Sequence, residues 1–317
     1  MALQDRAPAQ AVAAAPAART TAAADRVPPV ALVGTGILSI QFGAALSVTL
    51  FDDVGASGAS LLRLGFAAVI MLAFTRPRLR DHTRADLRLA LLFGLVLGGM
   101  NATFYEALHR LPLGVAVTIE FVGPLSVAVF TSKRRLDLVW AGLAAAGILL
   151  LADPFGARGG IDPVGLAFVL AAAACWAAYI LIAQRAGGRF EGMTGLALAM
   201  AVSVLVPLVP GLAQGGGDLL RPGILAIGVA VALASSVIPY ALETEALRRL
   251  PANVFGIFMS LEPAVAALAG LIVLGQALGA TDLVAMALVV TASIGVSRSR
   301  RRDPPPEAGI LGAACSP

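Results

Sequence analysis

Long apolar stretches, separated by short polar ones, run along most of the chain. Ten of these stretches are each about long enough to cross a bilayer as an α-helix. They span residues 30–50, 58–75, 87–108, 113–131, 136–152, 163–183, 192–210, 222–247, 252–274 and 280–297. Arg63 interrupts the second stretch and Pro207 the seventh. The pattern predicts an all-α integral membrane protein with ten transmembrane helices.

The two ends of the chain differ from the apolar part. Residues 1–28 are rich in Ala, with scattered Pro, Thr and Arg, and residues 298–317 form a basic segment that contains several prolines. The first of these has no compact apolar core followed by a cleavage site, which a secretory signal peptide would show. We expect a disordered N-terminal tail and a short C-terminal tail.

The basic residues fall mainly on one side of the predicted helices. If the N-terminus is inside, 19 of the 23 Lys and Arg residues lie in cytoplasmic segments, Arg110, Arg158 and Arg221 lie in outer loops, and Arg63 lies within a helix. Cytoplasmic loops of membrane proteins carry such an excess of positive charge. One missed or added helix would destroy the asymmetry, so we expect both termini in the cytoplasm.

A short motif occurs twice and indicates an internal repeat. Residues 106–112 (EALHRLP) recur as residues 245–251 (EALRRLP), at an offset of 139. The first copy follows an odd number of helices and lies outside, whereas the second lies inside. The sequence therefore predicts two inverted five-helix repeats, 29–152 and 163–297, an architecture typical of alternating-access carriers.

The composition excludes several other classes of protein. The chain is 58% hydrophobic and 13% charged, and its pI near 9.7 comes from loop clusters rather than from a nucleic-acid-binding face. Cys175 and Cys315 are the two cysteines, and no histidine lies at membrane depth, so we expect no disulfide framework, metal site, cofactor or catalytic constellation. Asp52 and Asp53 are expected in a solvated turn of the first outer loop.

Two glutamates lie where a charge is costly. Glu120 and Glu262 fall near the middle of their predicted helices, and a central carboxylate costs about 2.5 to 3.5 kcal/mol. Pro124 and Pro263 should kink the same two helices beside these acids. A carboxylate beside unwound backbone suits a cation or amine site. The alternative is a neutral acid that only joins helices.

Arg63 lies inside the second predicted helix, away from the polar segments at its ends. It lies about one turn inside the outer boundary, where its side chain could extend to the headgroups. The functional alternative is a partner for Glu120 or for a substrate carboxylate, which a guanidinium binds in bidentate fashion.

Other polar and aromatic residues recur at helical spacing. Asn101 and Tyr105 share one helix face, Trp176 and Tyr179 share another, and Tyr240 and Glu243 a third. Such faces suit a cavity wall for a small polar solute. Packing or an interfacial aromatic belt is the alternative for the rings.

Several of these residues lie in stretches that resemble a known family. The stretches are residues 97–101 (LGGMN), 112–116 (PLGVA), 120–124 (EFVGP), 174–181 (ACWAAYIL), 184–187 (QRAG), 238–240 (IPY) and 259–263 (MSLEP). With Arg63, they resemble the EamA branch of the drug/metabolite transporter superfamily, and within it the bacterial threonine and homoserine exporters. Two departures are Gln276, where the family usually has Glu, and Glu106, at a position that is often uncharged.

The resemblance implies a carrier in the bacterial inner membrane. Its expected substrates are small amino acids like threonine or homoserine, exported in exchange for protons from a central cavity. The alternatives are a carrier of drugs, metabolites or nucleobases, an amino-acid uptake carrier, and, more remotely, an intramembrane lipid-modifying enzyme. The sequence does not indicate an oligomeric state.

Overall fold

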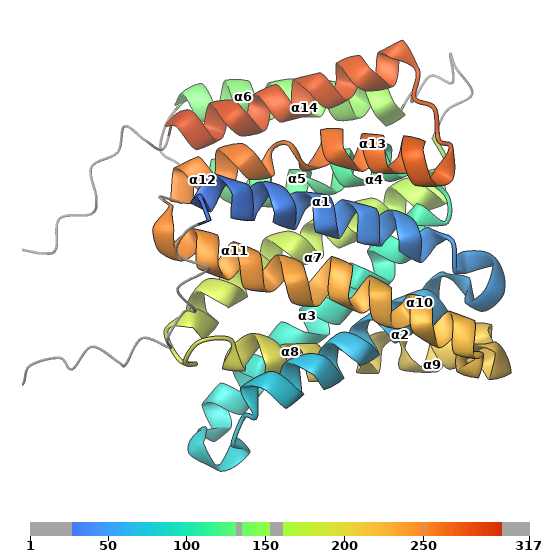
Figure 1. Cartoon of the computed structure of the whole chain (residues 1–317). Helices are drawn as coiled ribbons and strands as arrows, with labels where there is room; N and C mark the ends of the chain where they lie inside the picture. Colours follow the sequence, from blue (N-terminus) through green and yellow to red (C-terminus); the bar gives the residue numbers. More distant parts are fainter. Residues whose placement is uncertain (1–26, 131–134, 153–160, 251, 300–317) are drawn as a thin grey trace, which may run out of the picture.

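The computed structural model describes residues 27–130, 135–152, 161–250 and 252–299, and every element in these ranges is helical (Figure 1). The first half contains α1 (Pro29–Val48), α2 (Phe51–Thr75), α3 (Arg84–Leu108), α4 (Leu113–Glu120), α5 (Val122–Phe130) and α6 (Arg135–Ala152). The second contains α7 (Pro163–Gly187), α8 (Thr194–Ser203), α9 (Leu205–Gly215), α10 (Pro222–Ala232), α11 (Ile238–Arg249), α12 (Ala252–Met259), α13 (Glu262–Leu274) and α14 (Ala280–Ser299). Short 3-10 helices lie at Leu79–Asp81 and Gly216–Leu220, and a π-helix at Leu233–Val237.

Nine spans in the described residues are long and apolar enough to cross a membrane. Four of them are built from consecutive helices: α4 with α5, α8 with α9, α10 with α11, and α12 with α13. The remaining predicted span coincides with α6, whose apolar part, Leu136–Leu151, is shorter than the others. The chain is therefore a polytopic α-helical membrane protein. Most of the two predicted tails, 1–26 and 300–317, and Arg158 in its loop lie outside the described residues.

The start of the second predicted helix is wrong by seven residues. α2 begins at Phe51, so Asp52 and Asp53 form its first turn instead of a loop. Carboxylates are favoured there because the helix dipole is positive at its N-terminus. Gly55 then interrupts the helix with φ 71° and ψ 168°, a conformation that L-residues avoid. The acids and the glycine looked like a loop in the sequence, but they form a short helical turn followed by a break.

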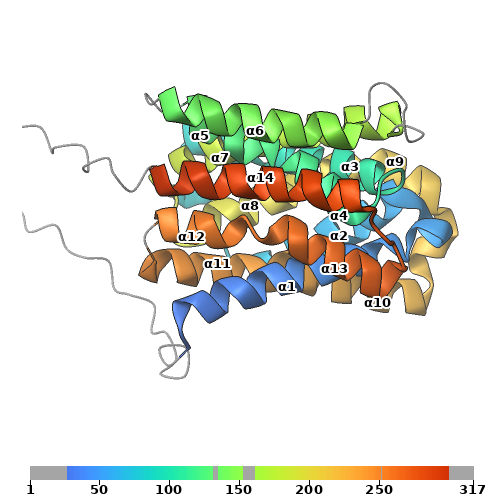
Figure 2. The ribbon, with the colours of Figure 1, turned by 90° about the horizontal axis from the view of Figure 1, so that it is seen from above.

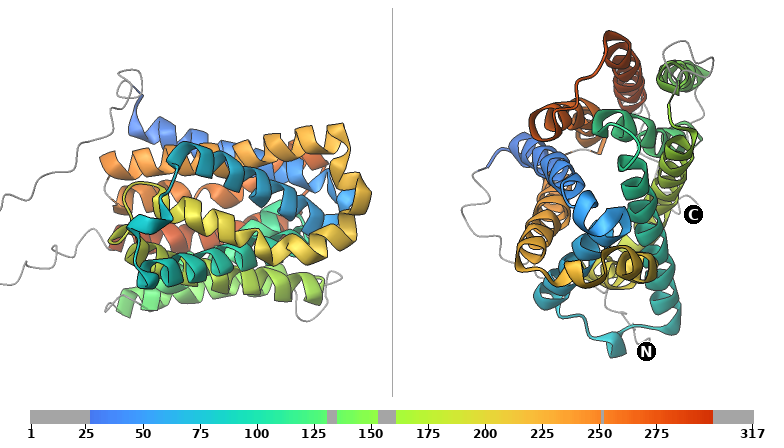
Figure 3. Two further views of the ribbon diagram at one scale, coloured as in Figure 1. Left: turned by 90° about the horizontal axis from the view of Figure 1, so that it is seen from below. Right: turned by 90° about the vertical axis from the view of Figure 1, so that its right-hand side faces the viewer.

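The helices pack as a layered bundle in which distant segments lie side by side. α3 packs against α7 and α8, α1 against α11 and α13, and α2 against α8, α9 and α10. α4 packs against α13, and α6 pairs with α14 along one edge (Figures 2 and 3). The beginning of α1 and the end of α14 lie at the same end of the bundle, on the left of Figure 1.

Small residues allow the closest of these helix contacts. A Cβ on Gly94 would lie 2.4 Å from Cβ of Val202, and a Cβ on Gly98 would lie 2.5 Å from the carbonyl oxygen of Ser203. α3 therefore approaches α8 at backbone distance, as small-residue helix interfaces in membranes do.

Candidate functional site

The fourth predicted span is broken beside Glu120. α4 ends at Glu120 and α5 begins at Val122, two residues before Pro124. Proline has no N–H to donate to the carbonyl four residues earlier, which is that of Glu120. The Glu120 side chain is 8% exposed. A buried carboxylate thus lies at the last residue before a break in the helix.

The ninth predicted span is broken in the same way. α12 ends at Met259, four residues before Pro263, and α13 begins at Glu262. Glu262 is 4% exposed. In the break itself, the Ser260 hydroxyl lies 2.7 Å from that of Ser293 on α14. The second carboxylate therefore follows its break, whereas Glu120 precedes the first.

Arg63 is buried in the bundle and binds the π-helix. It is 5% exposed, so the alternative in which it extends to the headgroups is wrong. Its Nη2 donates to the carbonyl oxygen of Ser235 at 2.8 Å and its Nε to the hydroxyl of Ser236 at 3.1 Å. Its Nη1 donates to the Tyr105 hydroxyl at 3.4 Å. None of these three hydrogen bonds goes to Glu120, so the attraction between the two opposite charges acts across a gap.

The π-helix explains why Ser235 can bind Arg63. Residues Leu233–Val237 form one wide turn between α10 and α11, and π-turns occur frequently at functional sites. The carbonyl oxygen of the preceding residue, Ala234, also accepts a bond of 2.7 Å from the hydroxyl of Ser39 on α1. Two consecutive backbone oxygens of the π-helix thus accept bonds from side chains of α1 and α2.

Titratable side chains from several helices lie within electrostatic range of one another around Tyr240. Tyr240 interacts with Arg63, Glu120, Glu243 and Glu262. Glu262 also interacts with Glu120 and Glu243, and Tyr179 with Tyr240 and Glu243. We call these six residues the central polar group: Arg63, Glu120, Tyr179, Tyr240, Glu243 and Glu262. It combines a guanidinium with three carboxyl groups and two phenols, so it offers donors for a carboxylate and acceptors for an ammonium group.

Of the three other predicted site residues, Tyr105 contacts Arg63 of this group, whereas Trp176 and Asn101 contribute packing and a bond within a helix. Tyr105 is fully buried, which excludes the interfacial-belt interpretation, and its ring lies 5.6 Å from the Arg63 guanidinium carbon. Trp176 packs edge-on against Phe121, the residue in the first break, with ring centroids 5.4 Å apart. The amide of Asn101 donates to the Leu97 carbonyl oxygen of its own helix at 2.9 Å.

Sequence reasoning missed the serines that hold Arg63. Ser235 and Ser236 are both fully buried, and two adjacent serines in an apolar span were the available signal. The hydroxyl of Ser235, and that of Ser60 on α2, are buried without a hydrogen-bond partner within the described ranges. In the same ranges, no three His, Cys, Asp or Glu side chains are grouped to hold a metal ion.

A second polar cluster, also missed, holds the break in α2. Gln214 of α9 accepts a bond of 2.9 Å from the backbone N–H of Ser57, which the break at Gly55 leaves free. The Ser57 hydroxyl in turn donates to Glu106 on α3 at 2.9 Å. Glu106, one of the two departures from the family pattern, therefore joins α2 to α3.

Gln276, the other departure, caps a helix of the site. Its Oε1 accepts a bond of 2.9 Å from the backbone N–H of Leu113, the first residue of α4. An amide and a carboxylate can both accept such a bond. Gln276 therefore links α4 to the segment that follows α13, and a glutamate at this position could accept the same bond.

Apolar helices that are broken at prolines beside buried acids are typical of membrane carriers and indicate this class of protein. The comparisons with known proteins specify it further. Residues 163–298 match the EamA-like transporter family. The chain is 42% identical to the threonine/homoserine exporter RhtA of Salmonella typhimurium over 87% of its own length and 93% of that protein, and equally identical to RhtA of Escherichia coli K12. The chain belongs to the EamA-like transporter family.

One solved crystal structure of a protein has the same fold. It matches with a TM-score of 0.57 over 86% of this chain and 98% of the other, at 18% sequence identity. At this identity the match concerns the fold alone.

Proposed function

We propose that the protein is a secondary active exporter of small amino acids such as threonine or homoserine. The observation that carries this proposal is the 42% identity to exporters of these two amino acids over 93% of their length. The central polar group, in which Arg63, Glu120 and Glu262 are buried and the other three residues half-buried, adds a site whose chemistry suits a zwitterion. The relatives are exporters, and we likewise propose transport and no enzymatic reaction for this chain.

The proposed architecture has ten transmembrane helices in two inverted repeats, 29–152 and 163–297. The helix contacts support it. In the proposed repeat α1 corresponds to α7, α3 to α10 with α11, and α5 to α13. The contact of α3 with α7 then has its counterpart in that of α11 with α1, and the contact of α5 with α7 in that of α13 with α1. α2 corresponds to α8 with α9, and α6 to α14, and these corresponding helices pack directly against each other. The beginning of α1 and the end of α14 lie at the same end of the bundle, which supports two termini on one side of the membrane. The excess of basic residues in the predicted loops on that side supports a cytoplasmic location in the bacterial inner membrane.

In the proposed binding mode the amino acid spans the central polar group. Arg63 has five N–H donors, and three of its nitrogens already donate, so two donors stay available for a substrate carboxylate. The carboxyl groups of Glu120, Glu243 and Glu262 then face the ammonium group, and Tyr240 lies among them. The substrate thereby replaces water around groups that are costly to leave unpaired.

We further propose that Glu120 or Glu262 exchanges a proton during alternating access. Both acids adjoin a break, so a change of helix angle at Phe121 or Ser260 would move them relative to Arg63. A proton that enters from the outside would release the ammonium group there, and its loss to the cytoplasm would restore the site.

Efflux of radiolabelled threonine from proteoliposomes, with and without a pH gradient, tests this function. We expect a gradient that is acidic outside to accelerate efflux, and E120Q or E262Q to remove this acceleration with the fold retained. E191Q is the matched control, because Glu191 is an exposed loop residue. Full proton-linked efflux in both site variants would contradict the coupling, and no amino-acid efflux from the wild type would contradict the function. Uptake, drugs and nucleobases, tested in parallel, separate the related carrier activities.

A further inference from the structure

A groove lined by arginines lies between α3 and α7, outside the central polar group. It has a volume of about 600 Å³, and Arg88 of α3, Arg185 of α7 and Arg189 in the following segment line it. Leu89 and Leu92 of α3 form its apolar wall. The beginning of α3 and the end of α7 lie at the end of the bundle where α1 begins (Figure 1). The groove is therefore at a membrane boundary, the cytoplasmic one in the proposed topology.

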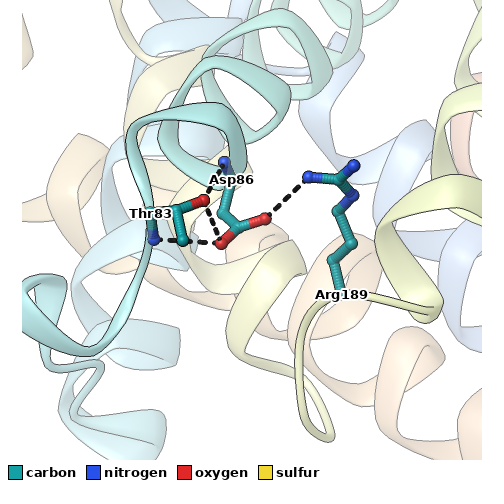
Figure 4. A network of polar contacts seen from close by, with 3 residues as sticks. All are labelled: Thr83, Asp86 and Arg189. Carbon is teal, nitrogen blue, oxygen red and sulfur yellow. Dashed lines mark hydrogen bonds and ion pairs between the residues drawn. The ribbon is translucent and has the colours of Figure 1, made fainter.

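One of the three arginines is fixed by the protein. Arg189 donates from Nη1 to Oδ1 of Asp86 at 3.0 Å (Figure 4). The other oxygen of Asp86 accepts from the backbone N–H of Thr83 at 3.0 Å and from its hydroxyl at 2.6 Å. The capping box at the start of α3 thus holds Asp86, and Asp86 holds Arg189.

The other two arginines have no partner in the described part of the chain. Arg88 and Arg185 are exposed, and neither forms a hydrogen bond or ion pair there. Asp86 neutralises one of the three positive charges, so the groove keeps an excess of two. Like charges that line one groove repel, and an anion between them would remove this repulsion.

The groove changes from basic to apolar with depth. On α3, Leu92 follows Arg88 by four residues. On α7, Leu181 precedes Arg185 by four. Each leucine therefore lies about 6 Å along its helix from the arginine, toward the interior of the membrane. Leu92 is 51% exposed and Leu181 40% exposed, so both face the surroundings of the bundle. Ala85 and Gly188 also line the groove, and their small size leaves space between the arginines.

We propose that this groove binds the phosphate headgroup of an anionic phospholipid, with an acyl chain along Leu92 and Leu181. Basic grooves between helices at the cytoplasmic boundary suit lipid headgroups, and Arg binds phosphate in bidentate fashion. A free phosphate would use the arginines but not the exposed leucines below them. The inference rests on the membrane-spanning fold and is independent of the transported substrate.

The test is a titration of the purified protein in detergent with phosphatidylglycerol, followed by native mass spectrometry. Phosphatidylcholine with the same acyl chains and inorganic phosphate are the comparison ligands. The wild type should bind phosphatidylglycerol in preference to both. R88Q/R185Q should weaken this binding about thirtyfold, because each arginine near an anionic headgroup contributes about 1 kcal/mol to the binding free energy. R78Q/R80Q removes two exposed arginines outside the groove and should leave it unchanged.

Two more variants separate the lipid site from a general charge effect and from misfolding. R88K/R185K keeps the charge and should keep most of the binding, whereas A85W keeps all three arginines, fills the space between them and should abolish it. Equal binding of both phospholipids by the wild type, an equal loss in R78Q/R80Q, or binding of inorganic phosphate without phosphatidylglycerol would each overturn the proposal. Because no transport is measured, failure of the exporter function would not affect this result.

Discussion

The two broken spans use the same backbone device but place their acids differently. In both, the first helix ends four residues before a proline, at Glu120 before Pro124 and at Met259 before Pro263. The acid of the first span is the last residue of α4, whereas the acid of the second, Glu262, is the first residue of α13. The proline therefore determines where the helix breaks, and the acid is placed independently of it.

The helix dipoles make this difference electrostatic. A helix C-terminus carries partial negative charge and an N-terminus partial positive charge. Glu120 is thus at the unfavourable end of α4, and Arg63 is the cation that attracts it. Glu262 is at the favourable end of α13, and the two carboxyl groups that act on it, those of Glu243 and Glu120, repel its charged form. One carboxyl group depends on an arginine and the other on a helix terminus.

Packing explains why the first span has no acid at the second position. Gly123 occupies the place that Glu262 has in the second span. A Cβ on Gly123 would lie 2.3 Å from the carbonyl oxygen of Ala173 on α7, which leaves no space for a side chain. The close contact of α5 with α7 therefore excludes a symmetric arrangement of the two acids.

Removal of Arg63 should have the largest effect. R63M leaves Glu120 without its cation and should lower the free energy of unfolding by about 3 to 5 kcal/mol. A double-mutant cycle measured by thermal unfolding in detergent sharpens the comparison. In the cycle of R63M with E120Q, we expect a coupling energy of about 0.5 to 3 kcal/mol. In the cycle of R63M with E262Q, we expect less than about 0.5 kcal/mol. Equal coupling to both acids would contradict the distinction.

Substitution of Gly123 should have the next largest effect. G123A forces α5 away from α7 and should destabilise the protein by about 1 to 3 kcal/mol. G142A is the matched control, because a Cβ on Gly142 meets no atom within 4 Å. Thermal unfolding of both variants in one detergent provides the measurement. A neutral G123A would show that packing does not exclude a side chain there.

Loss of the Gln276 link should have a smaller effect. Q276M removes the acceptor for the Leu113 N–H and should cost about 1 kcal/mol, whereas Q276E keeps an acceptor and should stay near the wild type. The melting temperatures of the two variants test this. Similar losses in both would indicate that Gln276 contributes through its shape and not through the hydrogen bond.

The smallest effect concerns the first helices of the two halves. Asp162 caps α7, whereas α1 begins after Pro28 without a side-chain cap. The backbone N–H groups of Gly165 and Val164, with Arg110, lower the pKa of the Asp162 carboxyl. A lowered pKa in the folded state stabilises the fold above about pH 4, and this contribution is lost as the pH falls through the lowered pKa.

D162N should therefore lower the melting temperature slightly at pH 7 and leave it closer to the wild type at pH 3. P28A, at the start of α1, serves as a control and should show no such dependence on pH. An equal effect of D162N at both pH values would contradict a contribution from the ionised carboxyl.

Hydropathy predicted the nine spans that are long and apolar enough to cross a membrane, and Pro124 and Pro263 predicted the breaks in two of them. The separation of α8 from α9 and of α10 from α11 was not predicted. The start of α2 was missed because Asp52, Asp53 and Gly55 have loop composition, although a helix N-terminus also favours acids. Glu120 was one of the two partners that the sequence suggested for Arg63, but the approach of Tyr240 to both depends on helix packing, which one sequence does not contain. The π-helix was not predictable either, since Leu233–Val237 has no local signal beyond its two serines.

The pairing of α6 with α14 has a consequence for biosynthesis. α6 packs on a helix that begins about 130 residues later in the chain, and a Cβ on Gly147 of α6 would lie 2.7 Å from the carbonyl oxygen of Ala285. At about 5 to 20 residues per second, the ribosome needs roughly 7 to 26 s to produce this stretch. During that time α6, with the shortest apolar stretch of the predicted spans, must stay in the bilayer or at the insertion machinery without its partner. Assembly of this edge of the bundle is therefore completed only near the end of translation.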